Sequence, residues 1–300
     1  AVPTTYGLKF AILACEFQRH RERLEQLRPR IAVGKMPGAV GTQASFGPDA
    51  AQLQEGVMRE LGLQPALSAN QALQRDRHAE LIFVLALAAA SGEKIAREIR
   101  NLQRTEIGEL AESFQSQQVG SSAMPQKRNP QRSERICSLA RMIRALVAPA
   151  LENVPLEHER DLTHSAAERI IFPEACILTD YLLRELQELL QGLTFRPEAI
   201  QRNLRLTRGL IMSERLMLKL VEKGLGRQEA HEIMRLAANR AFQEQAALQD
   251  VLGKDPTISR LLSAEQLTEY LDPERYIGTA VAQVDQVLAV LRQAPASVEA

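Results

Sequence analysis

DRHAELIFVLALAAASGEKIAREIRNLQRTEIGE, residues 76–109, is the stretch of this 300-residue chain that decides its fold. It contains no proline, and apolar side chains recur along it at alternating steps of four and three residues, the spacing of one helix face. At about 1.5 Å per residue, a helix over the whole stretch would be roughly 50 Å long, which is longer than a small domain is wide. The pattern predicts a long helix that packs laterally in the bundle of an oligomer. The predicted face consists of Leu81, Leu85, Ala88, Gly92, Ile95, Ile99 and Leu102.

Other segments between the prolines show the same helical period. A stripe near the start of the chain includes His20, which we expect to be a packed or interface histidine and not a catalyst. A Gly-rich break at residues 223–226 precedes a last helical region, 227–291, with turns at 255–256 and 272–273. Further helices are predicted at about residues 131–147, 165–191 and 198–223. The stripe consists of Tyr6, Phe10, Leu13, Phe17, His20, Leu24 and Leu27.

Composition agrees with an all-α fold. Hydrophobic residues make up 45% of the chain but aromatics only 4%, and tryptophan is absent, so the core must be built from small aliphatic side chains that suit close-packed helices. We predict a long-helix bundle domain over residues 1–222, with an aperiodic loop at 111–130. A small helical domain over residues 223–300 is predicted to follow it.

Charge and cysteine usage exclude several classes of protein. Basic and acidic residues balance at 37 each, so no global field favours nucleic acid or an anionic membrane. The longest apolar run, residues 81–90, is well short of the roughly 20 residues that a membrane span needs. Three widely spaced cysteines indicate reduced thiols in a cytoplasmic protein, and no spacing of metal ligands occurs.

The loop contains the strongest functional signal, GSSAMPQKRNP at residues 120–130. Gly120 permits unusual backbone angles before two hydroxyl groups, and two prolines stiffen the exit. The loop precedes a predicted helix start near Gln131, whose free N–H groups favour an anion. From the residues alone, a Ser/Pro-rich connector between helices is equally compatible with this pattern.

The segment resembles the signature G-S-S-x-M-P-x-K-x-N-P of the fumarase/aspartase superfamily at every fixed position. The resemblance implies that the loop closes over substrate and that Ser121 is the base that removes a proton from carbon. It also implies that Lys127 contacts a substrate carboxylate, and that Glu134 corresponds to the acidic residue beside this lysine. Residues 111–130 are expected to be mobile without ligand. The other substrate contacts implied in the loop are Ser122, Met124 and Asn129.

Two more segments resemble the adenylosuccinate lyases of this superfamily. QALQRDRH at residues 71–78 is similar to their T/S-Q-x-x-x-R-D-R-H segment, with Asn70 where threonine is usual, and it implies that Gln71 contacts substrate. Its alternative interpretation is a capped helix entry with Asp76 at the N-cap.

The second segment, HERDLTHSAAER at residues 158–169, is similar to a stretch that faces the nucleotide in these enzymes, and Glu157 stands where tryptophan is usual. The resemblance assigns Arg160, Ser165 and Arg169 to substrate. Ser165 and Arg169 are four residues apart on one helix face, and two guanidinium groups with a hydroxyl suit a phosphate. A solvated, charged helix start is the alternative.

The resemblance runs from residue 1 to about 292, and the chain opens on residues that follow a histidine segment of the family. We therefore expect this chain to lack an N-terminal third that carries the usual general acid, and to be inactive alone. The implied activity is elimination of fumarate from adenylosuccinate and from the succinylated carboxamide ribotide of purine biosynthesis. The implied enzyme needs no cofactor and no metal, and is a cytoplasmic homotetramer with active sites shared between subunits.

Other interpretations stay open at this point. An argininosuccinate lyase or a carboxymuconate cycloisomerase would carry the same loop signature, although the 75–78 and 158–169 segments favour a nucleotide substrate. The chain could also be a catalytically silent helical scaffold.

Overall fold

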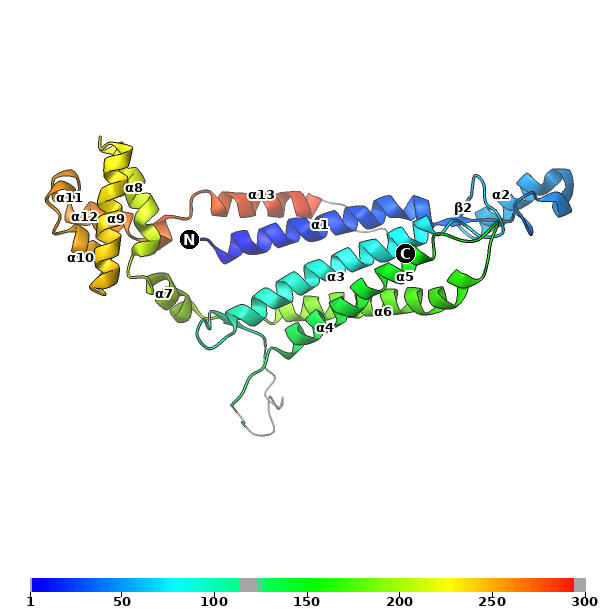
Figure 1. Ribbon diagram of the computed structural model, residues 1–300, viewed down its shortest axis with the longest axis horizontal. Helices are drawn as coiled ribbons and strands as arrows, with labels where there is room; N and C mark the ends of the chain where they lie inside the picture. The colour runs from blue at the N-terminus through cyan, green and yellow to red at the C-terminus, as the bar shows by residue number, and fades with distance from the viewer. Residues whose placement is uncertain (1, 114–123, 125, 294–300) are drawn as a thin grey trace. The chain divides into compact units, whose positions relative to one another are not determined.

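The computed structural model describes residues 2–113, 124 and 126–293. The secondary structure of this part of the chain is almost all helical, with only four short strands of two residues each, so the all-α class predicted from composition is confirmed (Figure 1). Within the described residues, no helix is long and apolar enough to cross a membrane.

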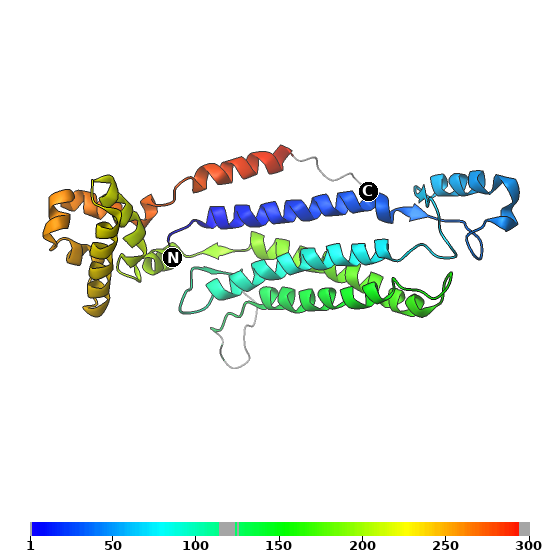
Figure 2. The same ribbon diagram turned by 45° about the horizontal axis from the view of Figure 1, so that its top comes forward.

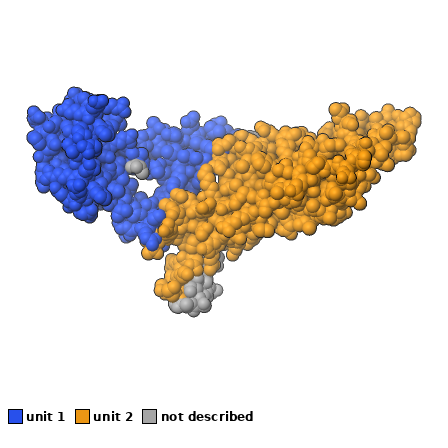
Figure 3. Space-filling model, viewed as in Figure 1, with its two compact units in different colours: residues 1–15, 106–109, 196–300 blue, residues 16–105, 110–195 orange. Residues whose placement is uncertain are grey.

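The chain divides into two compact units (Figure 3). Residues 16–105 and 110–195 form what we call the bundle unit, and residues 1–15, 106–109 and 196–300 form the C-terminal unit. Helix α1 (Tyr6–Ile31) contributes residues to both. The domain boundary predicted at residue 222 stays a prediction.

Three long helices lie side by side in the bundle unit, as both ribbon views show (Figures 1 and 2). Helix α4 runs antiparallel to α6, because Arg132 at its start pairs with Glu185 and Glu188 near the end of α6. Helices α3 and α6 begin at the same end of the bundle, where Arg75 and Glu168 form an ion pair. The helices of this unit, besides α1, are α2 (Ala50–Glu60), α3 (Asp76–Leu102), α4 (Gln131–Ala145), α5 (Val147–Glu152) and α6 (Thr163–Gln191).

Short strands join the ends of these helices. Strand β1 (Val33–Gly34) pairs in parallel with β2 (Gln64–Pro65), and β3 (Leu110–Ala111) pairs antiparallel with β4 (Thr194–Phe195). The second pair ties the chain after α3 to the chain after α6. A 3-10 helix, η1 (Ala44–Asp49), precedes α2.

Helix α3 is the centre of the bundle unit, because apolar residues surround most of its circumference. Ile82, Ala89 and Ile99 are all buried, and α3 packs against α4, α5 and α6. Gly92 allows α6 to approach closely, since a Cβ atom there would lie 2.9 Å from Cδ2 of Leu182. The helix predicted from residue 76 therefore exists, but it ends at Leu102 and not at 109.

A buried polar network joins α1 to α3. The Ser91 hydroxyl donates to Glu16 Oε1 at 2.5 Å and lies 2.7 Å from His20 Nε2, while Arg23 Nη1 lies 3.1 Å from His20 Nδ1. Because arginine can only donate, Nδ1 accepts and Nε2 carries the hydrogen. Burial, followed by the neighbouring Arg23, lowers the pKa of His20. His20 is 4% exposed, so the prediction of a packed histidine is confirmed.

The C-terminal unit has its own core around α8 and α9. Leu216 and Leu220 of α8 pack with Ala230 and Met234 of α9. Arg215 is buried and donates to the carbonyls of Glu269 and Asp272, which satisfies acceptors at the end of α12. The elements of this unit are α7 (Pro197–Arg205), η2 (Leu210–Met212), α8 (Ser213–Glu222), α9 (Arg227–Gln243), α10 (Leu248–Leu252), α11 (Pro256–Leu261), α12 (Ala264–Tyr270), η3 (Pro273–Arg275) and α13 (Ala280–Gln293).

Two predictions about these helices were wrong. The helix expected over residues 198–223 is broken, because Arg208 and Gly209 adopt left-handed backbone angles, with φ of 50° and 92°. Hydrogen bonds from Arg208 to the carbonyl and side chain of Gln245 hold this break. In the α1 stripe, Leu24 is 39% exposed and does not belong to the buried face.

Replacing Ile136 by alanine tests the packing of the bundle unit. Ile136 on α4 is fully buried, so the change should leave a cavity and lower the free energy of unfolding by about 2–4 kcal/mol. Ser138→Ala, at an exposed position on the same helix, is the matched control and should change it by less than about 0.5 kcal/mol. Denaturant unfolding followed by circular dichroism measures both, and equal midpoints for the two variants would contradict this packing.

Candidate active site

The entry to α3 and the start of α6 are joined by a paired ion bridge. Arg75 donates from Nε and Nη2 to the two carboxylate oxygens of Glu168, at 2.7 and 2.6 Å. The side chains are 11% and 15% exposed, so water screens this pair less than a surface pair. Arg75, and not Asp76, is the N-cap residue of α3, and its side chain does not cap the helix, so the predicted Asp76 cap was wrong. Asp76 instead lies in the first turn, where a negative charge suits the helix dipole.

The predicted substrate residues of the two segments flank this bridge. Arg160 Nε donates to Gln71 Oε1 at 2.9 Å, across 89 positions of the sequence. On α6, Arg169 Nη1 donates to the Ser165 carbonyl at 2.9 Å and to its hydroxyl at 2.5 Å. Arg169 is exposed, while Arg160 and Ser165 are half-buried. Four predicted substrate residues thus lie at one end of the bundle unit, namely Gln71, Arg160, Ser165 and Arg169. The guanidinium groups of the two arginines are accessible to an anion there.

Asp161 organises the turn that presents Arg160. Its carboxylate accepts from the backbone N–H groups of Glu157 and Thr163, at 2.9 and 2.8 Å, and from the Thr163 hydroxyl. The Thr163 hydroxyl and then the two N–H groups lower the pKa of Asp161 to about 2. This aspartate therefore stays charged at any pH near neutrality and fixes the turn.

His78 lies in the first turn of α3, near Arg75, and its ring packs edge-on against that of Phe172 at a centroid distance of 5.6 Å. Burial, and then the positive charge of Arg75, lowers the pKa of His78 to about 4. The imidazole is therefore neutral near pH 7, which avoids a second positive charge beside Arg75.

The signature segment is only partly described. Ser121 and Ser122 lie outside the described residues, as does most of the loop for which mobility was predicted. Met124 and Lys127 are exposed, Asn129 is half-buried, and Glu134 is exposed in the first turn of α4. Within the described residues, Lys127 and Glu134 make no ion pair with each other.

The start of α4 already holds an anion from the chain itself. The Glu112 carboxylate accepts from the N–H groups of Arg132 and Ser133, at 3.2 and 2.8 Å. We expected these N–H groups to be free for a ligand, and that expectation was wrong. Glu112 acts as the cap because the strand pairing after α3 holds it beside α4.

The two groups of predicted residues lie at opposite ends of α3. Arg75 and the substrate cluster are at its start, whereas Gln103, just past its end, donates to the carbonyl of Arg128 in the signature segment. A helix of 27 residues separates these ends by roughly 40 Å. Within one chain, the described part of the signature segment and the cluster therefore do not form one site.

The sequence alone did not assign a role to several residues that shape these regions. Arg75 and Glu168 were within the recognised segments, but charge spacing could not pair residues 93 positions apart. Glu112 gave no signal, because an isolated glutamate in an aperiodic stretch has many possible roles. In the part of the chain that the structure describes, no group of three or more metal-ligating side chains gathers in one place.

Comparison with known proteins agrees with this geometry. A family model described as lyase matches residues 1–145, and one described as adenylosuccinate lyase C-terminus matches residues 209–287. The chain is 55% identical over 288 residues to adenylosuccinate lyase of Pyrococcus abyssi and 53% identical over 289 residues to that of Methanothermobacter thermautotrophicus. Both matches cover 96% of this chain and 64% of the relative. Over most of its length the chain is thus similar to the adenylosuccinate lyase family.

Solved structures place the family in its superfamily. The 3-carboxy-cis,cis-muconate lactonizing enzyme from Pseudomonas putida superposes with a TM-score of 0.89 at 35% identity, covering 98% of this chain and 64% of that one. A fumarate lyase from Mesorhizobium gives 0.88 at 34% identity, covering 96% and 64%. The predicted long-helix bundle of fumarase/aspartase type, with a C-terminal helical domain, is confirmed. The chain spans about 64% of the length of the relatives that it matches.

The lowered pKa of His78 predicts a pH-dependent loss of stability. The unfolded chain binds a proton near the ordinary pKa of about 6.5, above the folded value of about 4. Stability from this group is therefore complete above pH about 6.5 and falls as the pH drops toward 4. The melting temperature of His78→Gln should depend less on pH between these values than that of the unmodified chain. His231→Gln, at an exposed position on α9, is the control, and an equal reduction there would contradict the assignment.

Proposed function

We propose that the protein to which this chain belongs is a carbon–nitrogen lyase. It eliminates fumarate from adenylosuccinate, giving AMP, and from the succinylated carboxamide ribotide of purine biosynthesis. The observation that carries this proposal is the gathering of Gln71, Arg160, Ser165 and Arg169 around the Arg75–Glu168 bridge. Identity of 53–55% to adenylosuccinate lyases supports the same substrates.

The proposed chemistry is a β-elimination that needs no metal or organic cofactor. The Ser121 oxygen takes the proton from the carbon beside a succinyl carboxylate, and the electron pair forms the C=C bond of fumarate as the C–N bond breaks. An acid then protonates the departing nitrogen. A serine hydroxyl is a poor base, so its alkoxide needs the positive charge of Lys127, local N–H donors and exclusion of water. Glu134 lies in the first turn of α4 and follows Lys127 in the sequence.

The nucleotide half of the substrate is held by the cluster at the start of α6. Arg169 and Arg160 offer charge-assisted hydrogen bonds to a phosphate, and Ser165 adds a hydroxyl donor. Arg75 and Glu168 fix the spacing between the entry to α3 and α6, so that Gln71 and Ser165 face the ligand from two elements. In the loop, Ser122, Met124 and Asn129 contact the succinyl end.

The active site is shared between subunits of a homotetramer. The roughly 40 Å between the loop and the nucleotide cluster supports this, because both groups can meet one substrate only if different chains supply them. An apolar stripe on α6, formed by Ile170, Ile177 and Tyr181, is exposed in the single chain and suits a helix of another subunit. We place the assembled enzyme in the cytoplasm, with no nucleic-acid or membrane partner.

Buried polar atoms near the cluster support the same conclusion. Asn153 Nδ2 and His164 Nδ1 have no hydrogen-bond partner among the described residues, although their side chains are only 7% and 9% exposed. Such groups are costly unless another chain, substrate or water pairs with them. The start of α6, where His164 lies, is thus incomplete in one chain.

The alternative functions have less support. The chain is 35% identical to a muconate lactonizing enzyme, which is lower than its 55% identity to an adenylosuccinate lyase. Activity of the full-length protein on adenylosuccinate, compared with argininosuccinate and carboxymuconate, decides among these. Activity of the 300-residue chain alone tests the silent-scaffold alternative.

Two substitutions in the full-length protein should separate chemistry from binding. Ser121→Ala should abolish turnover with little effect on substrate binding, because the alkoxide acts in the transition state. Arg169→Ala should mainly raise KM, by a factor that corresponds to roughly 2–3 kcal/mol, because it removes a charge-assisted contact. Steady-state kinetics measure both. Near-normal kcat in Ser121→Ala would refute the base assignment, and an unchanged KM in Arg169→Ala would refute the phosphate contact.

Mixing the two inactive or weakened variants tests whether the site is shared. If Ser121 and Arg169 of one site come from different chains, hybrid tetramers regain sites with both residues intact, about a quarter of all sites at equal mixing. At substrate concentrations well below the raised KM, activity should therefore exceed that of either variant after the two proteins are dissociated and reassembled together. The control is each variant taken through the same treatment alone. If the mixture gains no activity while gel filtration shows mixed tetramers, the shared-site proposal fails.

A further inference from the structure

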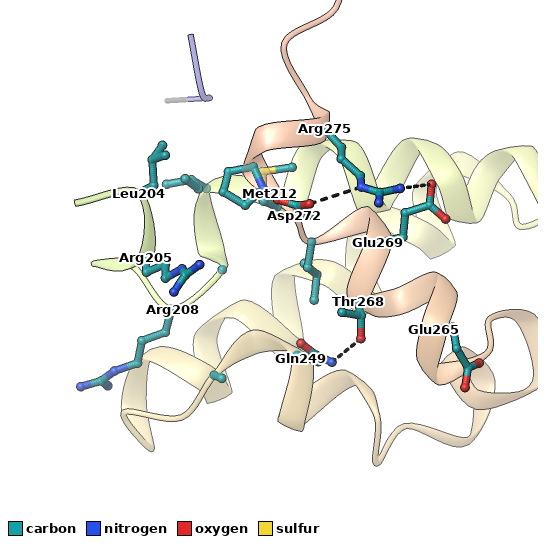
Figure 4. Close-up of a pocket in the computed structure, with 15 residues that line it drawn as sticks. Leu204, Arg205, Arg208, Met212, Gln249, Glu265, Thr268, Glu269, Asp272 and Arg275 are labelled. Carbon is teal, nitrogen blue, oxygen red and sulfur yellow. Dashed lines mark hydrogen bonds and ion pairs between the residues drawn. The ribbon is translucent and has the colours of Figure 1, made fainter. Parts of the chain in front are cut away.

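A cavity of about 840 Å³ lies within the C-terminal unit, and none of the predicted active-site residues lines it (Figure 4). Its walls come from four separate segments, namely the end of α7, the chain leading to η2, the start of α10, and α12 with η3. This volume is in the range of small-molecule sites. Because every wall belongs to one compact unit, the cavity does not depend on how the two units are arranged.

The lining combines an apolar surface with a polar rim. The apolar part is supplied by Leu204, Ile211, Met212, Leu271 and Pro273. Met212 is completely buried, so this surface is continuous with the core of the unit. An apolar wall of this kind favours a ligand with a hydrocarbon or aromatic body.

The acidic groups of the rim are already engaged. Figure 4 shows Arg275 between Glu269 and Asp272, with N–O distances of 3.5 and 3.4 Å. The Ser263 hydroxyl lowers the pKa of Glu265 by hydrogen bonding to it. Gln249 donates to the Thr268 hydroxyl at 2.8 Å. Glu269 and Asp272 thus share one arginine, whereas Glu265 keeps its negative charge without an ion-pair partner among the described residues.

Arg205 differs from the other rim residues. Figure 4 shows its side chain directed from the end of α7 toward the helix that carries Thr268, whereas Arg208 points away to Gln245. Among the described residues, the Arg205 guanidinium has no hydrogen-bond or ion-pair partner. Arg205 thus offers the rim a positive charge that no described side chain neutralises by direct contact.

The wall beside Arg205 is held in place before any ligand binds. Arg208 adopts a left-handed conformation that is uncommon for a residue with a side chain. Its carbonyl accepts from Leu248 N at 2.9 Å, and its guanidinium donates to Gln245, which is itself left-handed. These bonds fix the chain between α7 and η2 against α10, so the cavity is preformed.

We propose that this cavity binds a small molecule that carries one anionic group on an apolar or aromatic body. Arg205 holds the anion, and the wall around Ile211 and Met212 holds the body. Carboxylates, phosphates and sulfonates share this chemistry. The site is separate from the proposed lyase site, and occupancy of one does not require the other.

Binding of anilinonaphthalene sulfonate, a fluorescent aromatic anion, tests the proposal on the full chain. Arg205→Ala should weaken the cavity-specific binding about tenfold, the effect of one charge-assisted hydrogen bond, and Arg205→Lys should weaken it less. Ala247→Leu, which fills the cavity from the start of α10, should remove it. Arg227→Ala, at an exposed position outside the cavity, is the matched control and should leave binding unchanged. Circular dichroism verifies that each variant is folded.

Competition distinguishes the possible sources of the anion. Phenyl phosphate, phenylacetate and AMP combine both features and are compared as competitors, while inorganic phosphate lacks the apolar body and should displace the dye poorly. Wild-type binding by both Arg205→Ala and Ala247→Leu would overturn the proposal. If only Ala247→Leu lost binding, the claim that the ligand carries an anionic group held by Arg205 would be refuted. If inorganic phosphate displaced the dye as strongly as phenyl phosphate, the claim that the ligand has an apolar body would be refuted.

Discussion

The separation imposed by α3 is the constraint on which the rest of the molecule depends. The helix is rigid because apolar residues cover most of its surface and three helices pack against it. It therefore keeps its two ends roughly 40 Å apart whatever happens in the adjoining loops. Residues at these ends can act together only if several chains assemble, so the proposed catalysis and the proposed tetramer follow from the same helix.

Buried polar groups give this helix its register with its neighbours. Ser91 bonds to Glu16 and His20 of α1, and Glu93 pairs with Arg144 of α4 at 2.5 Å. Apolar side chains tolerate sliding, whereas these groups lose their partners if α3 shifts by one turn. Arg75 and Glu168 act in the same way at the start of α6. Correct register at that end keeps Gln71 within hydrogen-bonding distance of Arg160.

Helices and fold class could be predicted from the sequence, because they depend on local periodicity and composition. The long helix from residue 76 and the all-helical class could be predicted because proline-free apolar periodicity has few other solutions. The resemblance placed Gln71 and Arg160 in one site before their hydrogen bond was seen. The break at Arg208 could not be predicted, because it depends on bonds to Gln245, 37 positions away. The exposure of Leu24 likewise depends on which helix lies opposite, and periodicity does not contain that information.

The role of Glu112 changes how the signature loop can work. A free helix N-terminus would attract substrate carboxylates by itself, but Glu112 accepts from the N–H groups of Arg132 and Ser133. A second anion there would meet a negative charge, so the helix dipole is largely neutralised before substrate arrives. Under the proposed function, binding of the succinyl carboxylates then relies on side chains of this segment, with Lys127 and Asn129 among them. In the proposed reaction, electrostatic stabilisation therefore relies on side chains and not on a permanent anion site at the start of α4.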